Sequence, residues 1–213
     1  MVSGLIGKKI GMTQVFREDG QFVPATVIQA GPCVVVQKKT AAKEGYDSVQ
    51  LGLVEFVKPA RVNLPTAGHY RKAGVEPGKR LAEFRVMPGG EVNVGDRFTV
   101  EVFKLKEKVD VIATSIGRGF QGFVKRHHFK GGEGSHGSMF HRAPGSIGAS
   151  SFPSRVWKGQ RMSGHMGNAR VTVRNLEVLQ IDAEDQLLVL KGAIPGPKGA
   201  YVMVRRAKKI SKR

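Results

Sequence analysis

One segment of this 213-residue chain lacks the composition needed to form a hydrophobic core. It runs from Gly117 to Gly167, and 12 of its 51 residues are glycine. From Gly117 to Arg161 it holds eight Lys or Arg residues and a single acid, Glu133. A stretch this basic and this poor in aliphatic residues buries too little apolar surface to offset the entropy lost on ordering. The core must therefore come from the residues on either side.

The same segment is rich in flat side chains. Five of the chain's six histidines lie in it, together with the only tryptophan and several phenylalanines, namely Phe120, Phe123, Phe129, Phe140, Phe152 and Trp157. Cations beside flat rings are the side-chain types that bind RNA, the cations through phosphates and the rings by stacking on bases. We therefore expect the segment to become ordered against RNA.

The net charge of +18 is unevenly distributed. Residues 117–161 carry +7 and residues 191–213 carry +8, while basic doublets stand at Lys8-Lys9, Lys38-Lys39 and Arg71-Lys72. A large excess of positive charge favours nucleic acid or an anionic membrane as the partner. No apolar run approaches the roughly 18 residues of a membrane span, and the first residues are too polar for a signal peptide. We expect a cytoplasmic nucleic-acid-binding protein.

Outside the segment the pattern predicts short β-strands separated by turn residues. The expected strands are residues 22–30, 33–39, 49–51, 97–103, 109–114, 170–181, 186–191 and 201–204. Short helices are expected over residues 66–74 and 121–129. Many short strands favour a mainly β fold, a closed antiparallel barrel that hides its sheet edges. We expect one structural domain, with residues 1–116 and 168–213 as its β body and residues 117–167 as an inserted basic extension.

The string GRGFQGFV from Gly117 to Val124 fits two nucleotide-binding patterns. One is the dinucleotide fingerprint, but no second strand and no suitably spaced acid follow it. The other is the kinase glycine-rich loop, but the chain contains neither an H-R-D nor a D-F-G motif. The glycines are better explained by tight turns and by close approach of the backbone to phosphates.

Metal binding and catalysis find little support. The clustered histidines match no zinc-binding spacing. The chain has no G-x-S-x-G motif and no pair of carboxylates expected in a basic cleft. Ser135 and His136 are only sequence neighbours, which does not give the geometry of a catalytic triad. Cys33 stands in an apolar run and is expected to be buried in the core. We expect no catalytic residue, no metal and no cofactor.

The residues from Phe103 to Arg126 resemble a known signature, that of the bacterial large-subunit ribosomal protein L three family. The signature is an aromatic residue, an Asp, a small residue and a Ser or Thr, then a Gly-basic-Gly-x-x-Gly string and an Arg. Its positions are filled here by Phe103, Asp110, Ala113, Ser115, Gly117, Arg118, Gly119, Gly122 and Arg126. Further blocks resemble the same family at residues 4–16, 135–137, 142–148, 158–167 and 188–196, so the resemblance spans nearly the whole chain.

This resemblance implies a six-stranded translation-protein-type barrel with an inserted extension. It implies a structural constituent of the large (50S) subunit that binds 23S ribosomal RNA near its 3′ end and nucleates assembly. It also implies a loop that reaches toward the peptidyl transferase centre, with its tip at about Pro144 to Pro153. The implied protein neighbours are ribosomal proteins of the L fourteen and L nineteen type.

The candidate RNA-binding residues fall into three groups. Phosphate contacts are expected from Arg118, Lys125, Arg126, Lys130, Arg142, Arg155, Lys158 and Arg161. Stacking or groove contacts are expected from His128, Phe129, His136, His141 and Trp157. The set is completed by Lys8, Lys9, His165, Lys198, Arg205 and Arg206. Two alternatives remain: a nucleic-acid chaperone or translation factor that cycles on and off RNA, and a metal- or nucleotide-dependent RNA-modifying enzyme.

Overall fold

The computed structural model describes residues 2–17, 19–86 and 91–207. The chain forms two compact units, which we call the body (residues 1–114 with 170–213) and the extension (residues 115–169). The boundaries expected from the sequence, 117 and 167, lie two residues inside those of the extension.

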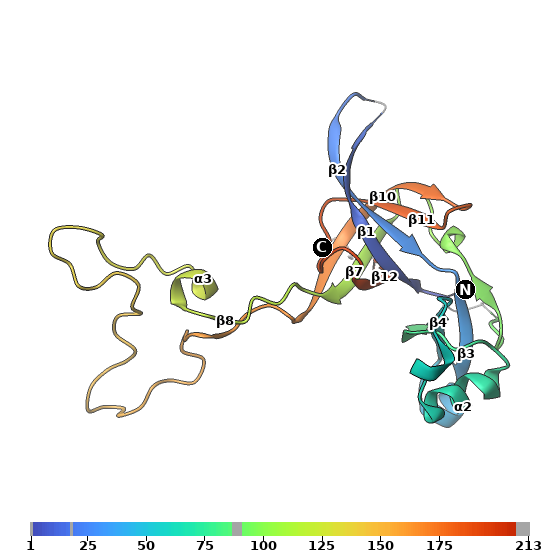
Figure 1. Ribbon diagram of the computed structural model, residues 1–213, viewed down its shortest axis with the longest axis horizontal. Helices are drawn as coiled ribbons and strands as arrows, with labels where there is room; N and C mark the ends of the chain where they lie inside the picture. Colours follow the sequence, from blue (N-terminus) through green and yellow to red (C-terminus); the bar gives the residue numbers. More distant parts are fainter. Residues whose placement is uncertain (1, 18, 87–90, 208–213) are drawn as a thin grey trace. The chain divides into compact units, whose positions relative to one another are not determined.

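Six antiparallel strands of the body pair in a closed cycle, in the order β1, β12, β7, β10, β11, β2. Their bounds are β1 Gly4–Phe16, β2 Phe22–Ala30, β7 Lys108–Thr114, β10 Arg170–Asp182, β11 Leu187–Lys191 and β12 Tyr201–Arg206. Because each strand has a partner on both sides, the backbone groups are satisfied without an open edge. Beyond the barrel, β1 and β2 continue together as a two-stranded hairpin (Figure 1). The expectation of a mainly β chain is confirmed.

A second sheet in the body has the order β5, β4, β3, β6, with bounds β3 Cys33–Lys39, β4 Ser48–Leu53, β5 Leu81–Arg85 and β6 Arg97–Phe98. Its connections contain the helices α1 Ala41–Glu44 and α2 Leu64–Ala73 and the 3-10 turn η1 Pro59–Arg61, and a second 3-10 turn, η2 Val100–Val102, follows β6. The side chain of Asn63 caps α2 by accepting a hydrogen bond from the Thr66 backbone N–H at 3.1 Å. Tyr70 of α2 packs on Val34 and Val36, so this helix covers one face of β3.

The two sheets share one hydrophobic core. Barrel residues such as Leu188 and Val204 belong to the same buried cluster as Val35 and Leu51 of the second sheet. Cys33 also lies in this cluster with no exposed surface, and burial raises the pKa of its thiol to about 12. The interpretation of Cys33 as a core residue is confirmed, and the body has the packed interior that a rigid scaffold requires.

Most predicted elements of the body are present, and three differ. The strands expected at 22–30, 33–39, 109–114 and 170–181 are confirmed, as is the helix at 66–74. The strand expected over 97–103 is wrong beyond Phe98, because Val100 begins a 3-10 turn and donates its N–H to Gln186 Oε1 at 3.1 Å. The sequence also failed to indicate β1 and β5, whose composition is not typical of strands.

The extension contains little regular structure. Its elements are β8 Phe120–Gln121, α3 Phe123–His127 and β9 Gly164–His165. The helix expected over 121–129 is therefore confirmed only in its centre. The remaining residues form turns and irregular chain, as Figure 1 shows.

Candidate nucleic-acid interface

The extension begins and ends as a two-stranded ribbon. The Ser115 N–H donates to the Ala169 carbonyl and the Arg118 N–H to the Met166 carbonyl, both at 2.9 Å. The Met166 N–H returns a bond to the Gly119 carbonyl at 2.9 Å, and β8 then pairs with β9. Backbone hydrogen bonds therefore hold the outgoing and returning chain together.

Helix α3 is attached to the returning chain through two basic side chains. The Arg126 guanidinium donates to the Met162 carbonyl at 2.6 Å, and the His127 ring nitrogen lies 2.9 Å from the same oxygen. A Cβ atom at Gly164 would come within 2.5 Å of the Arg126 guanidinium, so this glycine makes room for the arginine. Arg126 therefore positions the chain within the extension, in addition to the phosphate contact expected from the sequence.

Two further stretches of the extension, residues 131–133 and 140–142, also lie close together. The Gly132 N–H donates to the His141 carbonyl at 3.0 Å, and the His141 ring lies 2.8 Å from the Glu133 carbonyl. A Cβ atom at Gly132 would stand only 2.0 Å from the Phe140 carbonyl oxygen. Only glycine permits the two backbones to approach this closely. The ring of His141 is thus oriented by its own loop.

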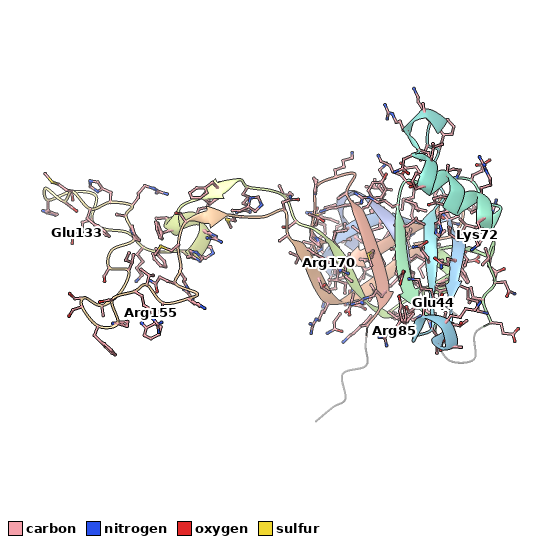
Figure 2. The ribbon with its side chains drawn as sticks, turned by 90° about the horizontal axis from the view of Figure 1, so that it is seen from below. Glu44, Lys72, Arg85, Glu133, Arg155 and Arg170 are labelled. Atoms are coloured by element: carbon pink, nitrogen blue, oxygen red, sulfur yellow. The ribbon has the colours of Figure 1, made fainter. Side chains whose placement is uncertain are left out.

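None of residues 115–169, all of which the structure describes, is buried. Met139 is 99% exposed, Phe152 88% and Phe120 75%. The side chains of the extension, among them the labelled Glu133 and Arg155, stand out from an open chain in Figure 2. Large apolar groups that remain in water are typical of a surface that meets a partner.

The cations of the extension are also open to solvent. The exposed members are Arg118, Lys125, Lys130, Arg142, Arg155, Lys158 and Arg161, whereas Arg126 is half-buried. Arg155 lies over the Trp157 ring, with 4.8 Å between its guanidinium carbon and the ring centroid. Among the described residues, all four ion pairs found lie in the body. Within the part of the chain that the structure describes, the cations of the extension are therefore not neutralised by ion pairs.

The predicted stacking residues do not form one cluster. Phe129 is half-buried and stacks on Phe123 with 6.0 Å between the ring centroids. His128 ends α3 in the left-handed conformation and is exposed, as are the other three predicted histidines and the tryptophan, namely His136, His141, His165 and Trp157.

The structure corrects the prediction that Lys9 contacts RNA. It is 9% exposed, and its ammonium donates to the Ile194 carbonyl at 3.0 Å and to the Gly196 carbonyl at 2.9 Å. Burial lowers the pKa of this lysine. Adjacent residues of a strand point to opposite faces, so Lys8 faces outward where Lys9 faces inward. Lys9 therefore fixes the turn before β12 and is not available to a phosphate.

The other body residues predicted to contact RNA differ in exposure and in the contacts they already make within the protein. Lys198 is exposed and Arg205 half-buried. Arg206 lies 3.1 Å from a Glu107 carboxylate oxygen and donates to the Val102 carbonyl at 2.6 Å, so its guanidinium already serves the body. Of the basic tail that follows, residues 208–213 lie outside the described residues.

The sequence did not indicate that three cations gather around Tyr201. The ring of Tyr201 has Lys8 at 5.8 Å, Lys79 at 5.6 Å and Arg80 at 5.1 Å from its centroid. Glu55 accepts a hydrogen bond from the Tyr201 hydroxyl. We call these five residues the Tyr201 patch. Lys8 was predicted as an RNA contact, but Lys79 and Arg80 were not, because an isolated basic doublet resembles any solvated pair.

The histidines do not form a metal site. Within the described ranges, no three His, Cys, Asp or Glu side chains are grouped closely enough to hold a metal ion. The same residues contain no helix long and apolar enough to cross a membrane. The carboxylates at 182–185 form a turn, in which Asp182 accepts from the Glu184 and Asp185 backbone N–H groups.

Comparison with known proteins identifies the class and then the family. Residues 92–213 match the family described as Ribosomal protein L3. The large ribosomal subunit protein uL3 of Solibacter usitatus is 65% identical over 210 residues, which cover 98% of this chain and 100% of the relative. The protein of the same name in Trichlorobacter lovleyi is 53% identical over 212 residues, covering 100% of both chains. That of Thermotoga petrophila is 54% identical over 204 residues, covering 96% of this chain and 97% of the relative.

A mainly β body, a cationic extension without buried residues and relatives of this kind over the full length together define a ribosomal protein. The chain belongs to the ribosomal protein L3 family. This is a family of structural proteins of the large ribosomal subunit, so the relatives confirm the expectation that the chain is not an enzyme. The names of these relatives match neither a cycling factor nor an RNA-modifying enzyme.

Proposed function

We propose that the protein binds the ribosomal RNA of the large subunit directly, and that the extension supplies most of the contacts. One observation supports this proposal above all. The extension carries eight cations and one acid, buries none of its side chains and has no ion pair among its described residues. Such a segment lacks both a core and a counter-charge, and RNA supplies both through phosphates and base faces.

The seven exposed cations of the extension are the proposed phosphate ligands, and Arg126 contributes both to the phosphate surface and to the shape of the loop. The proposed ring contacts are His128, Phe129, His136, His141, Trp157 and His165. On the body, Lys8, Lys198 and Arg205 remain candidates, Arg206 acts mainly within the protein and Lys9 is withdrawn.

The family resemblance supports finer proposals about the partner. The RNA is the 23S species near its 3′ end, and binding belongs to the nucleating steps of 50S assembly. Residues 144–153 extend toward the peptidyl transferase centre, and the protein neighbours are of the L fourteen and L nineteen type. The closed sheet of the body serves as a translation-protein-type barrel, and residues 117–167 are the part devoted to RNA.

An energetic argument supports a role in assembly. Ordering the backbone of the extension costs roughly 1–2 kcal/mol per residue. Each neutralised phosphate releases counterions, which makes binding favourable at low salt and weaker as salt rises. Many contacts made together are needed to offset such a cost, and packed RNA helices offer them during subunit formation.

The test is the salt dependence of affinity for two transcripts, one from the 3′ region of 23S RNA and one of equal length from the 5′ region. The full-length chain should bind the 3′ transcript more tightly, with a steep slope of log affinity against log salt. The double variant Arg142→Ala/Arg155→Ala should reduce that slope by about 1–2. The double variant Lys38→Ala/Lys72→Ala removes the same charge from the body and is the matched control. Equal slopes for all three proteins would refute the assignment.

A further inference from the structure

The Tyr201 patch concentrates three cations around a single ring. Lys8 of β1 stands directly across from Tyr201 of β12 in the strand register. Its ammonium donates to Glu55 Oε1 at 3.1 Å, and the Tyr201 hydroxyl donates to Glu55 Oε2 at 2.5 Å. Lys79 and Arg80 approach the same ring from the segment before β5 and are exposed.

The backbone that carries Lys79 and Arg80 is held in place. The Leu53 N–H donates to the Arg80 carbonyl at 3.1 Å, and the buried Tyr70 hydroxyl donates to the Gly78 carbonyl at 3.3 Å. A Cβ atom at Gly78 would stand 2.4 Å from the Leu53 carbonyl oxygen, so this position requires glycine. The two cations therefore start from a fixed point beside the ring and do not belong to a freely moving loop.

The charges of the patch do not balance. Three cations share one carboxylate, which leaves a net charge of +2 close to one ring. The Tyr201 hydroxyl, ahead of Lys8, holds the pKa of Glu55 below its ordinary value, and each oxygen of this carboxylate already accepts a hydrogen bond within the patch. Like charges gathered on a fixed scaffold repel one another, and an external anion removes that repulsion. A cation–π contact serving the fold alone requires only one of the three.

We propose that the Tyr201 patch is a phosphate-binding site on the body, and that its ligand is a phosphodiester of RNA. Arg80 and Lys79 supply the charge-assisted hydrogen bonds. The Tyr201 ring keeps both side chains extended, and Glu55 holds Lys8 and the Tyr201 hydroxyl in place. This site rests on the proposed RNA-binding function, but it is made entirely of body residues. It gives the body an RNA contact of its own, independent of the extension.

The experiment uses the full-length chain and the 3′ 23S transcript. The double variant Lys79→Gln/Arg80→Gln should lower the slope of log affinity against log salt by about 1–2. The double variant Lys38→Gln/Lys72→Gln, which removes two exposed cations without a shared ring, should leave the slope nearly unchanged. Tyr201→Phe keeps the ring and the cations and should lower the slope by less than the Lys79/Arg80 pair.

Thermal melting without RNA separates binding from a purely structural role. The proposal expects the Lys79→Gln/Arg80→Gln protein to melt at the same temperature as the parent chain or higher, because repulsion has been removed. A marked fall in melting temperature with an unchanged salt slope would show that the cations serve the fold, and would overturn the site.

Three further outcomes are distinguishable. Inorganic phosphate, tested alone by the same melting assay, should stabilise the parent chain less than the transcript does at equal phosphate concentration. Stabilisation by inorganic phosphate that is lost in the double variant, with no change in the RNA slope, would overturn the RNA assignment in favour of a free anion. If the parent chain itself binds RNA without salt dependence, the proposed function fails. If only the Arg142→Ala/Arg155→Ala protein loses slope, the proposed function stands and this site fails.

Discussion

The body and the extension of this protein obtain their structure from different sources. In the body, strands far apart in sequence bury one shared cluster of aliphatic side chains. In the extension, glycine-mediated backbone contacts and a few side-chain hydrogen bonds shape the chain without burying a residue. The difference shows that two segments of one chain can both be given a defined shape by the sequence, one through a core and the other without one.

The charges follow the same division. Among the described residues, the ion pairs found connect residues of the body, such as Arg17 with Glu177 and Lys39 with Glu83. The extension presents its cations to solvent instead. The body is therefore stabilised by ion pairs within the chain, while the cations of the extension are the groups that we propose to contact RNA.

Thiol labelling gives the largest expected contrast between the two units. Cys33 has no exposed surface, and burial raises its thiol pKa to about 12. A second thiol introduced by Ser150→Cys lies at an exposed position of the extension. The introduced thiol should react with a thiol reagent at the rate of a free cysteine, and Cys33 at least about a thousandfold more slowly, since it must await opening of the body.

The parent chain, which contains Cys33 alone, is the control for this experiment. Adding the 3′ transcript should slow the introduced thiol and leave Cys33 unchanged. Fast labelling of Cys33 in the native protein would mean that the body is not a closed, packed unit.

Truncation of one large side chain in each unit gives the next largest contrast. Leu188→Ala removes a side chain with no exposed surface and should lower the free energy of unfolding by about 2–5 kcal/mol. Phe152→Ala removes a ring that is 88% exposed and should change the same quantity by no more than about 0.5 kcal/mol. Denaturant unfolding measures both. Comparable losses would place the Phe152 ring in a packed environment and erase the distinction between the two units.

Two lysines of the body that the sequence predicted as RNA contacts, Lys9 and Lys198, give a third contrast. Lys9→Met leaves the Ile194 and Gly196 carbonyls without their donor and should lower the free energy of unfolding by about 1–3 kcal/mol. Lys198→Met, at an exposed position, should have almost no effect on stability. Conversely, salt-dependent RNA binding should be insensitive to Lys9→Met once the weaker stability is allowed for. A lower salt slope in that variant would restore Lys9 to the RNA surface.

The Lys8-Lys9 doublet shows what can and cannot be predicted from the sequence. The extension was recognisable because its glycine content and charge are local properties of the chain. Strands such as Cys33–Lys39 were recognisable because β-branched runs carry their own signal. Lys8 and Lys9 look alike in the sequence, and only the register of β1 with β2 and β12 decides which one faces inward.

Long-range contacts explain the other differences. The alternation in residues 97–103 predicts a strand, but the side chain of Gln186 accepts the Val100 N–H across 86 residues of sequence and favours a turn there. β1 carries glycines and lysines and is a strand because β2 and β12 flank it. The Tyr201 patch draws on β1, β12 and the segments after β4 and before β5, so no single stretch of sequence contains it.

The smallest expected effect tests the hydrogen bond at the centre of that patch. Burial, and then the bond to Glu55, raises the pKa of Tyr201 from 10.0 to about 12. The folded state thus favours the neutral phenol, so this contribution to stability is complete below about pH 10 and is lost as the pH rises toward about 12. Tyr201→Phe removes the hydroxyl and should cost about 1 kcal/mol or less below pH 10. Between pH 10 and 12 the difference in unfolding free energy between the two proteins should shrink. Only the parent chain has a phenol to ionise, so only the parent chain loses the stability that the neutral phenol contributes. A difference that stays constant over the same interval would mean that the Tyr201 hydroxyl is not held by Glu55, and that the patch is less firmly built than the body around it.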